Sequence, residues 1–123
     1  MLEHPNAAII RNLYGTSGGP DAVAHLFDEQ VVWHVPGQHP MSGDHVGRNA
    51  VLAAMRYFEG IRLEVHDVVA NDDHVVALLR AKGGRKGKRY DALEIDVYHI
   101  KDGKITGFWS FSEDQRLTDE YWS

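Results

Sequence analysis

Apolar residues recur at every second position over long stretches of the second half of the chain, between residues 61 and 112. A period of two is the signature of β-strands that bury one face. Turn-forming residues interrupt it at 71–73, within 82–89 and at 101–104, where Asp102-Gly103 is a strong hairpin signal. The pattern predicts a meander of long antiparallel strands over residues 61–70, 74–82, 90–100 and 105–112.

The first half of the chain carries helical spacing instead. Pro5 and Pro20 each suit the first turn of a helix, because the missing proline N–H costs nothing there. A third helix is predicted over 49–59, and a short strand rich in β-branched and aromatic residues over 30–35. The apolar positions that define the three helices are Ala7, Ile10 and Tyr14; Val23, Leu26 and Phe27; and Val51, Met55 and Phe58.

Helices followed by an antiparallel meander predict an α+β fold. A strongly curved sheet wrapped over three N-terminal helices would form a cone that is open at one end. Its interior would be the natural site for a small molecule. A closing helical turn is predicted over 113–122. The chain shows no internal repeat or linker, so residues 1–123 are expected to form one domain.

Composition and charge bear on partners and location. Eighteen acidic and thirteen basic residues give a formal charge of −5, whereas nucleic-acid-binding proteins usually carry a basic excess. The basic stretch 82–89 is interpreted as a solvated hairpin tip, with phosphate binding as the alternative. The chain has no cysteine, and no apolar run approaches the roughly 20 residues of a membrane span. Because the first residues also lack signal-peptide features, we expect a cytoplasmic protein without nucleic-acid or membrane partners.

The stretch 30–37 holds the first candidate for chemistry. Apolar residues flank a single imidazole at His34, and Pro36 and Gly37 then end the strand. Histidine is the side chain whose ordinary pKa lies closest to neutrality, so His34 in a closed pocket would be a proton-handling group. The alternative is a buried neutral histidine with one hydrogen bond.

Other catalytic classes have weaker support. His39 and His45 lie in a loop without recognised metal-ligand spacing, so free loop histidines are preferred over a metal site. Ser17 and Ser42 lack the context of a nucleophile elbow. No glycine-rich motif between a strand and a helix indicates a nucleotide. We therefore expect no metal and no cofactor.

Three segments, 32–37, 43–48 and 108–115, carry a resemblance to a known superfamily. Together with the order of the elements, they resemble the nuclear transport factor 2-like (cystatin-like) superfamily, and within it the SnoaL-like and ketosteroid-isomerase-like proteins. The resemblance covers nearly the whole chain and implies the cone-shaped fold. It is poorly specific for function, because the superfamily mixes isomerases, polyketide cyclases, epoxide hydrolases, dehydratases and non-catalytic binders.

The resemblance carries over to only some of the isomerase's residues. Its general base maps to His34, which would replace a carboxylate with an imidazole. Its proton-donating aspartic acid maps to Asp96, where the residue type is kept. Its oxyanion tyrosine maps near Arg11, so that role looks lost, and Tyr14 lies one turn away. With one of three groups retained, steroid isomerisation itself is not expected. A cyclase-like aspartate would fall near Glu113 or Asp114.

The strand over 90–100 has two possible orientations. Ala92, Glu94, Asp96 and Tyr98 alternate with Leu93, Ile95 and Val97, and the simplest interpretation exposes the polar set to water. The resemblance implies the reverse. An inward Asp96 would orient His34, or would stay protonated and donate to a developing oxyanion. The residues expected to line the pocket are Tyr14, Val32, Pro36, Met55, Phe58, Tyr98, Phe108, Ser110 and Ser112.

Two functions follow from these observations. The first is a cofactor-free enzyme of the isomerase or polyketide-cyclase type, with His34 and Asp96 acting on a hydrophobic carbonyl compound; epoxide opening or dehydration is a weaker option. The alternative is a non-catalytic module that holds an apolar ligand or a protein partner in the same cone. The outer sheet face, expected to include Trp33, Val97 and His99, suits a homodimer.

Overall fold

Six strands form one sheet in the order β2-β1-β6-β5-β4-β3, in a computed structural model that describes residues 3–123. Neighbouring strands are antiparallel except β1 and β6, which are parallel. The elements in chain order are α1 (Pro5–Gly15), the 3₁₀ helix η1 (Pro20–Leu26), β1 (Phe27–Val35), β2 (Gly43–Val46), α2 (Arg48–Tyr57), β3 (Arg62–Ala70), β4 (His74–Arg85), β5 (Lys88–Lys101), β6 (Lys104–Ser112) and α3 (Gln115–Trp122).

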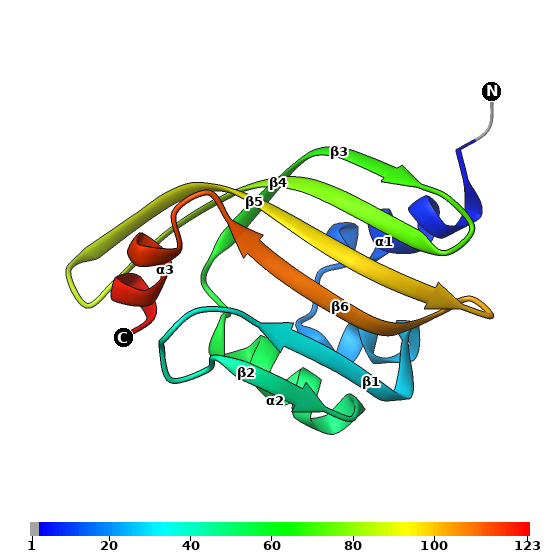
Figure 1. Cartoon of the computed structure of the whole chain (residues 1–123), viewed down its shortest axis with the longest axis horizontal. Helices are drawn as coiled ribbons and strands as arrows, with labels where there is room; N and C mark the ends of the chain where they lie inside the picture. The colour runs from blue at the N-terminus through cyan, green and yellow to red at the C-terminus, as the bar shows by residue number, and fades with distance from the viewer. Residues whose placement is uncertain (1–2) are drawn as a thin grey trace.

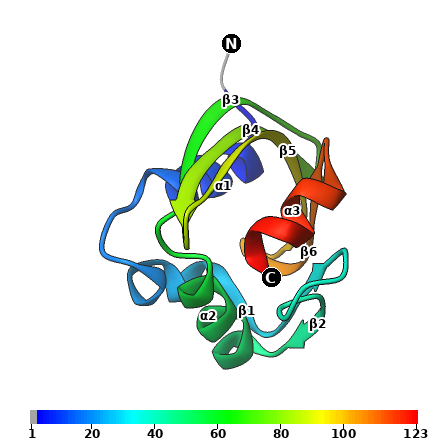
Figure 2. The same ribbon diagram turned by 90° about the vertical axis from the view of Figure 1, so that its left-hand side faces the viewer.

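The sheet curls around the helices, as Figures 1 and 2 show from two sides. Helix α1 lies against β3 and β4, α2 lies against β1, and α3 sits beside β5 near the β4–β5 hairpin. Register shifts in three of the strand pairs contribute to the curl, because a bulge bends its strand and increases the local twist. The predicted α+β fold and the meander are confirmed. The second predicted helix is a 3₁₀ helix, and β2 lies in a stretch that was expected to be a loop.

Two apolar clusters fill the inside of the curl. The larger one joins α1, η1 and α2 to the concave face of the sheet, and its largest fully buried side chains are Phe27, Ile10, Leu79, Ile105, Val31, Val51 and Val75. The smaller one attaches α3 to the far ends of β4 and β5 through Ala81, Tyr90, Ala92, Tyr121 and Trp122. Helix α3 therefore closes one end of the curl with its own small core.

Strand β5 has the inward phase that the resemblance implied. Ala92, Asp96 and Tyr98 are buried, while Leu93 and Ile95 on the other face are 49% and 40% exposed. The aliphatic set faces outwards together with Phe111, which is 49% exposed. The homodimer through this outer face stays a prediction. None of the helices within residues 3–123 is long and apolar enough to cross a membrane.

Strand β1 has the opposite phase from the one expected. Val31 and Val35 are buried towards the core, and Trp33 between them packs on Phe58 and Phe108. His34 therefore lies on the outer face, where its ring stacks on Trp109. Trp33 was predicted to belong to the outer face, and this prediction is wrong. The parallel pairing of β1 with β6 sets Trp33 beside Phe108, a residue of the inner face.

Gly37, where the chain leaves β1, has a backbone conformation that favours glycine, and a Cβ fits there only if side chains of α3 move. Its φ is +92°, and a Cβ at this position would overlap the side chains of Gln115 and Asp119 on α3. Gly60 has a similar φ of +95°, but no described atom lies within 4 Å of a Cβ built there. A comparison of alanine substitutions at the two glycines therefore separates the cost of backbone strain from the cost of steric overlap.

We expect Gly37→Ala to lower the free energy of unfolding more than Gly60→Ala does. Both variants take on the strain of a left-handed alanine, about 1–2 kcal/mol, and only Gly37→Ala adds the overlap with α3. Urea unfolding followed by circular dichroism measures both. Equal losses in the two variants would show that α3 moves away from Gly37 at no cost.

Candidate active site

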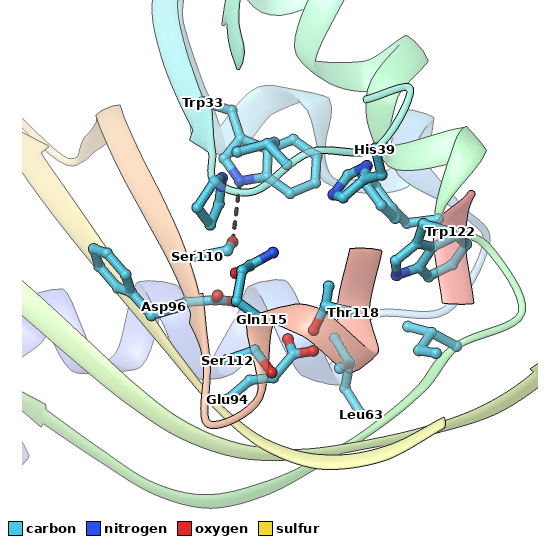
Figure 3. Close-up of a pocket in the computed structure, with 15 residues that line it drawn as sticks. Trp33, His39, Leu63, Glu94, Asp96, Ser110, Ser112, Gln115, Thr118 and Trp122 are labelled. Carbon is cyan, nitrogen blue, oxygen red and sulfur yellow. Dashed lines mark hydrogen bonds between the residues drawn. The ribbon is translucent and has the colours of Figure 1, made fainter. Parts of the chain in front are cut away.

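A cavity of about 130 Å³ lies between the end of β1, the inner face of β5 and β6, and α3. Figure 3 shows its two sides: aromatic rings that include Trp33 and Trp122, and a strip of polar side chains facing them. The strip consists of Asp96, Ser110, Glu94, Ser112, Gln115 and Thr118. The cavity is therefore apolar on one side and able to form hydrogen bonds on the other.

Asp96 is the most deeply buried member of the polar strip, at 8% exposure. The hydroxyl of Tyr14, on α1, donates a hydrogen bond of 2.6 Å to Asp96 Oδ2. The hydroxyl of Tyr98 lies 2.6 Å from that of Tyr14 and 3.4 Å from Asp96 Oδ2. The other carboxyl oxygen, Oδ1, is buried and has no hydrogen-bond partner among the described residues. Asp96 therefore has one oxygen held by tyrosine and one oxygen available.

The protonation of these groups follows from their burial. Burial raises the pKa of Asp96, and the nearby hydroxyl groups of Tyr14, Ser110 and Tyr98 offset part of that rise. Burial, together with the nearby Asp96 carboxyl, raises the pKa of Tyr14 and Tyr98 well above 10.0. Both tyrosines therefore stay protonated as hydrogen-bond donors, and burial shifts Asp96 towards its protonated form.

Glu94 forms a second polar centre at the end of the cavity near α3. The hydroxyl of Tyr90 donates to Glu94 Oε1 at 2.9 Å, and it also lies 2.9 Å from Ser112 Oγ and 2.8 Å from Thr118 Oγ1. Burial, and then the neighbouring Asp96 carboxyl, raises the pKa of Glu94 to about 7. Two carboxyl groups thus share one wall of an apolar cavity, two positions apart on β5.

His34 lies away from this cavity, so the prediction that it meets Asp96 inside a pocket is wrong. Its Nδ1 lies 2.7 Å from Asp44 Oδ1 on β2, and its ring stacks on Trp109 at a centroid distance of 4.5 Å. Its side chain is 32% exposed. The imidazole that lines the cavity belongs to His39, which was expected to be a free loop residue.

The other predicted pocket residues divide into three groups. Pro36, Phe58, Ser110 and Ser112 line the cavity. Tyr14, Tyr98 and Phe108 lie directly behind it, in contact with Asp96 or Trp33. The prediction was wrong for Val32, which shares the outward phase of His34, and for Met55, which packs against the larger core instead.

The resemblance placed the isomerase's oxyanion tyrosine near Arg11, and it is Tyr14, one turn further along α1, that reaches Asp96. Arg11 is solvent-facing and pairs with Glu3. The region predicted to hold a cyclase-like aspartate makes other contacts: Glu113 Oε1 accepts from the backbone N–H of Leu93, and Asp114 caps the N-terminus of α3. Neither residue lines the cavity.

Sequence reasoning missed Glu94, Gln115, Thr118 and Trp122 as members of the site. Glu94 was visible as part of the alternating set that contains Asp96, and an inward phase for one implies an inward phase for the other. The three residues of α3 gave no such signal, because the closing helix could not be placed against the sheet. Within residues 3–123, no group of three or more metal-binding side chains comes together.

We expect the stability of the protein to fall as the pH rises from 4.5 to 7, in part because of Glu94. The unfolded chain releases this proton near 4.5 and the folded protein holds it until about 7, which costs up to about 3 kcal/mol of unfolding free energy at neutral pH. Urea unfolding at several pH values should show a flatter pH dependence for Glu94→Gln. Parallel curves for the two proteins would contradict a raised pKa at Glu94.

Comparisons with known proteins identify relatives over the full chain. The model of the SnoaL-like domain family matches residues 14–108. The uncharacterised protein Rv0034 of Mycobacterium tuberculosis is 29% identical over an alignment of 131 positions, which covers 100% of both chains. Bal32a, from a soil-derived mobile gene cassette, is 31% identical, with a TM-score of 0.90 over 97% of each chain. A Xanthomonas campestris protein of unknown function with a cystatin-like fold is 26% identical, with a TM-score of 0.89 over 96% of this chain and 98% of that one.

Bal32a and the Xanthomonas campestris protein share the fold described above. The family match covers most of the chain and includes Tyr14, Trp33, Glu94 and Asp96. The protein belongs to the SnoaL-like family.

Proposed function

We propose that the protein is a cofactor-independent enzyme of the isomerase or cyclase type, which transfers a proton on a small hydrophobic carbonyl compound. The observation that carries this proposal is Asp96 Oδ1, a buried carboxyl oxygen without a partner among the described residues, on a residue that lines an apolar cavity. A polar atom in such surroundings is costly unless it binds something. A ligand with a polar atom would supply the missing partner.

The hydrogen bonds around Asp96 favour a role as donor. Because Tyr14 already donates to Oδ2, a proton on the carboxyl group would reside on Oδ1. The neutral acid would then donate from Oδ1 to the carbonyl oxygen of a substrate. When an enolate forms, negative charge develops on that oxygen and the hydrogen bond strengthens, which lowers the barrier. The Tyr98–Tyr14–Asp96 chain polarises the donor further.

The cavity supports a substrate about the size of one ring. Its volume is about 130 Å³, and an apolar cavity of about 150 Å³ holds a benzene ring. The aromatic side chains of Trp33, Phe58 and Trp122 supply flat apolar surfaces against which such a ring can pack. We therefore propose a monocyclic or similarly small ketone or aldehyde as the substrate class.

The alternative is a non-catalytic module that holds an apolar ligand in the same cavity. The apolar lining opposite Asp96 supports this alternative, and so does the position of His34 outside the cavity. The two functions share the ligand and differ in whether protons are exchanged.

We expect the protein to catalyse exchange of the methyl protons of acetophenone with deuterium in D₂O, followed by proton NMR. Acetophenone carries one ring and one carbonyl group. Asp96→Leu should reduce the protein-catalysed rate at least about 100-fold, because it removes the donor to the developing oxyanion. Asp96→Asn keeps an N–H donor, so its exchange rate should lie between those of the wild type and Asp96→Leu. His34→Ala, on the outer face, is the control and should retain the wild-type rate.

The outcomes separate the two functions. Exchange at the wild-type rate in Asp96→Leu would rule out Asp96 as the donor. If acetophenone quenches the tryptophan fluorescence of the protein but exchanges no faster than in buffer, the protein is a binding module.

A further inference from the structure

The proposed function needs a base as well as an acid, and the imidazole at the cavity is poorly suited to that task. The backbone N–H of Met41 donates to His39 Nδ1 at 3.2 Å. Burial lowers the pKa of His39, so its neutral form is favoured. With Nδ1 accepting a hydrogen bond, the neutral ring carries its proton on Nε2. The ring then offers the cavity a donor instead of a proton acceptor.

Glu94 occupies the position where a base is required. It lies two residues before Asp96 on the same face of β5, and its carboxyl group belongs to the same polar strip of the cavity wall (Figure 3). The Trp33–Ser110 hydrogen bond of 3.1 Å lies on the Asp96 side of this strip. A ligand whose carbonyl oxygen meets Asp96 would therefore extend towards Glu94 over apolar surface.

The surroundings of Glu94 fix the orientation of its carboxyl group. The Tyr90 hydroxyl is itself held between Ser112 at the end of β6 and Thr118 on α3. One Glu94 oxygen is thus fixed by a donor that is anchored on two further elements. Ser112 and Thr118 lie beyond residues 14–108, the part of the chain that matches the family model. This end of the cavity depends on the chain's own C-terminal helix.

We propose that Glu94 is the general base of the cavity and Asp96 its acid, an assignment that rests on the proposed function. The Glu94 carboxylate removes a proton from the carbon next to the substrate carbonyl. The C–H electron pair forms the C=C bond of the enolate, and the carbonyl π pair moves to the oxygen, which is stabilised by the hydrogen bond that protonated Asp96 Oδ1 donates to it. Glu94 returns the proton to another carbon in isomerisation; in D₂O it first exchanges its proton with solvent and then returns a deuteron to the same carbon, which completes exchange.

The relative burial of the two groups agrees with these roles. Burial raises the pKa of both groups, and Asp96 is the more deeply buried of the two, while a Glu94 pKa of about 7 leaves a substantial ionised fraction at neutral pH. Two adjacent carboxyl groups also resist being ionised together. The pair therefore favours one acid and one base at the same pH.

The test is acetophenone methyl exchange measured as a function of pH. The wild-type rate should rise as Glu94 loses its proton, with its midpoint near pH 7. Glu94→Gln should lower the rate at least about 100-fold and remove this rise. It should leave the affinity for acetophenone, measured by quenching of tryptophan fluorescence, within about twofold of the wild type, because Asp96 and the aromatic wall are retained.

Tyr90→Phe is the second variant and tests positioning. The Tyr90 hydrogen bond lowers the pKa of Glu94, so its loss should move the midpoint to higher pH without abolishing exchange. Tyr121→Phe is the matched control, because its ring packs on that of Tyr90 at 5.2 Å and it does not line the cavity. Its midpoint should equal that of the wild type.

Each outcome bears on one of the two proposals. Wild-type exchange that survives Glu94→Gln with its pH dependence intact would overturn the role of Glu94 alone. An unchanged midpoint in Tyr90→Phe would also overturn it. If the wild type exchanges acetophenone protons no faster than buffer does, the proposed function is wrong, and so is the assignment of Glu94 as its base.

Discussion

The hydrogen bond from Tyr14 to Asp96 joins the first helix to the middle of the sheet, and the site depends on it. A carboxyl group placed inside an apolar curl is strongly destabilising unless donors surround it. The distance of 2.6 Å between the Tyr14 hydroxyl and Asp96 Oδ2 supplies such a donor across 82 positions of sequence. The second carboxyl oxygen has no equivalent partner among the described residues. The fold therefore accepts one unsatisfied polar atom, and it belongs to a residue that lines the cavity.

Helix α3 completes the cavity from the opposite end of the chain. Its aromatic side anchors to Tyr90 and Ala92 through a small core, and its polar side brings Thr118 to the hydroxyl of Tyr90. The same helix thus packs against the sheet and orients the partner of Glu94. Both carboxyl groups owe their environments to helices from the two ends of the chain, although they stand two positions apart on one strand.

Much of the fold could be predicted because its signals are local. The alternation of Leu93, Ile95 and Val97 with Glu94 and Asp96 indicated a strand, and Asp102-Gly103 indicated its hairpin. Asp96 itself was predicted as a site residue from a family resemblance. The second helix and the short strand β2 were less predictable, because segments of four to seven residues take their form from their neighbours.

The sequence alone determined that β1 and β5 are strands and that neighbouring residues on them face opposite ways. It could not determine which set faces inwards, because both faces of each strand carry apolar side chains. Tertiary structure decided this: parallel pairing with β6 turned Trp33 inwards and His34 outwards. It also brought Tyr14 and α3 against the two carboxyl groups, and contacts between residues so distant in the chain have no local signature. A period of two specifies alternation, and only packing against the rest of the molecule chooses its phase.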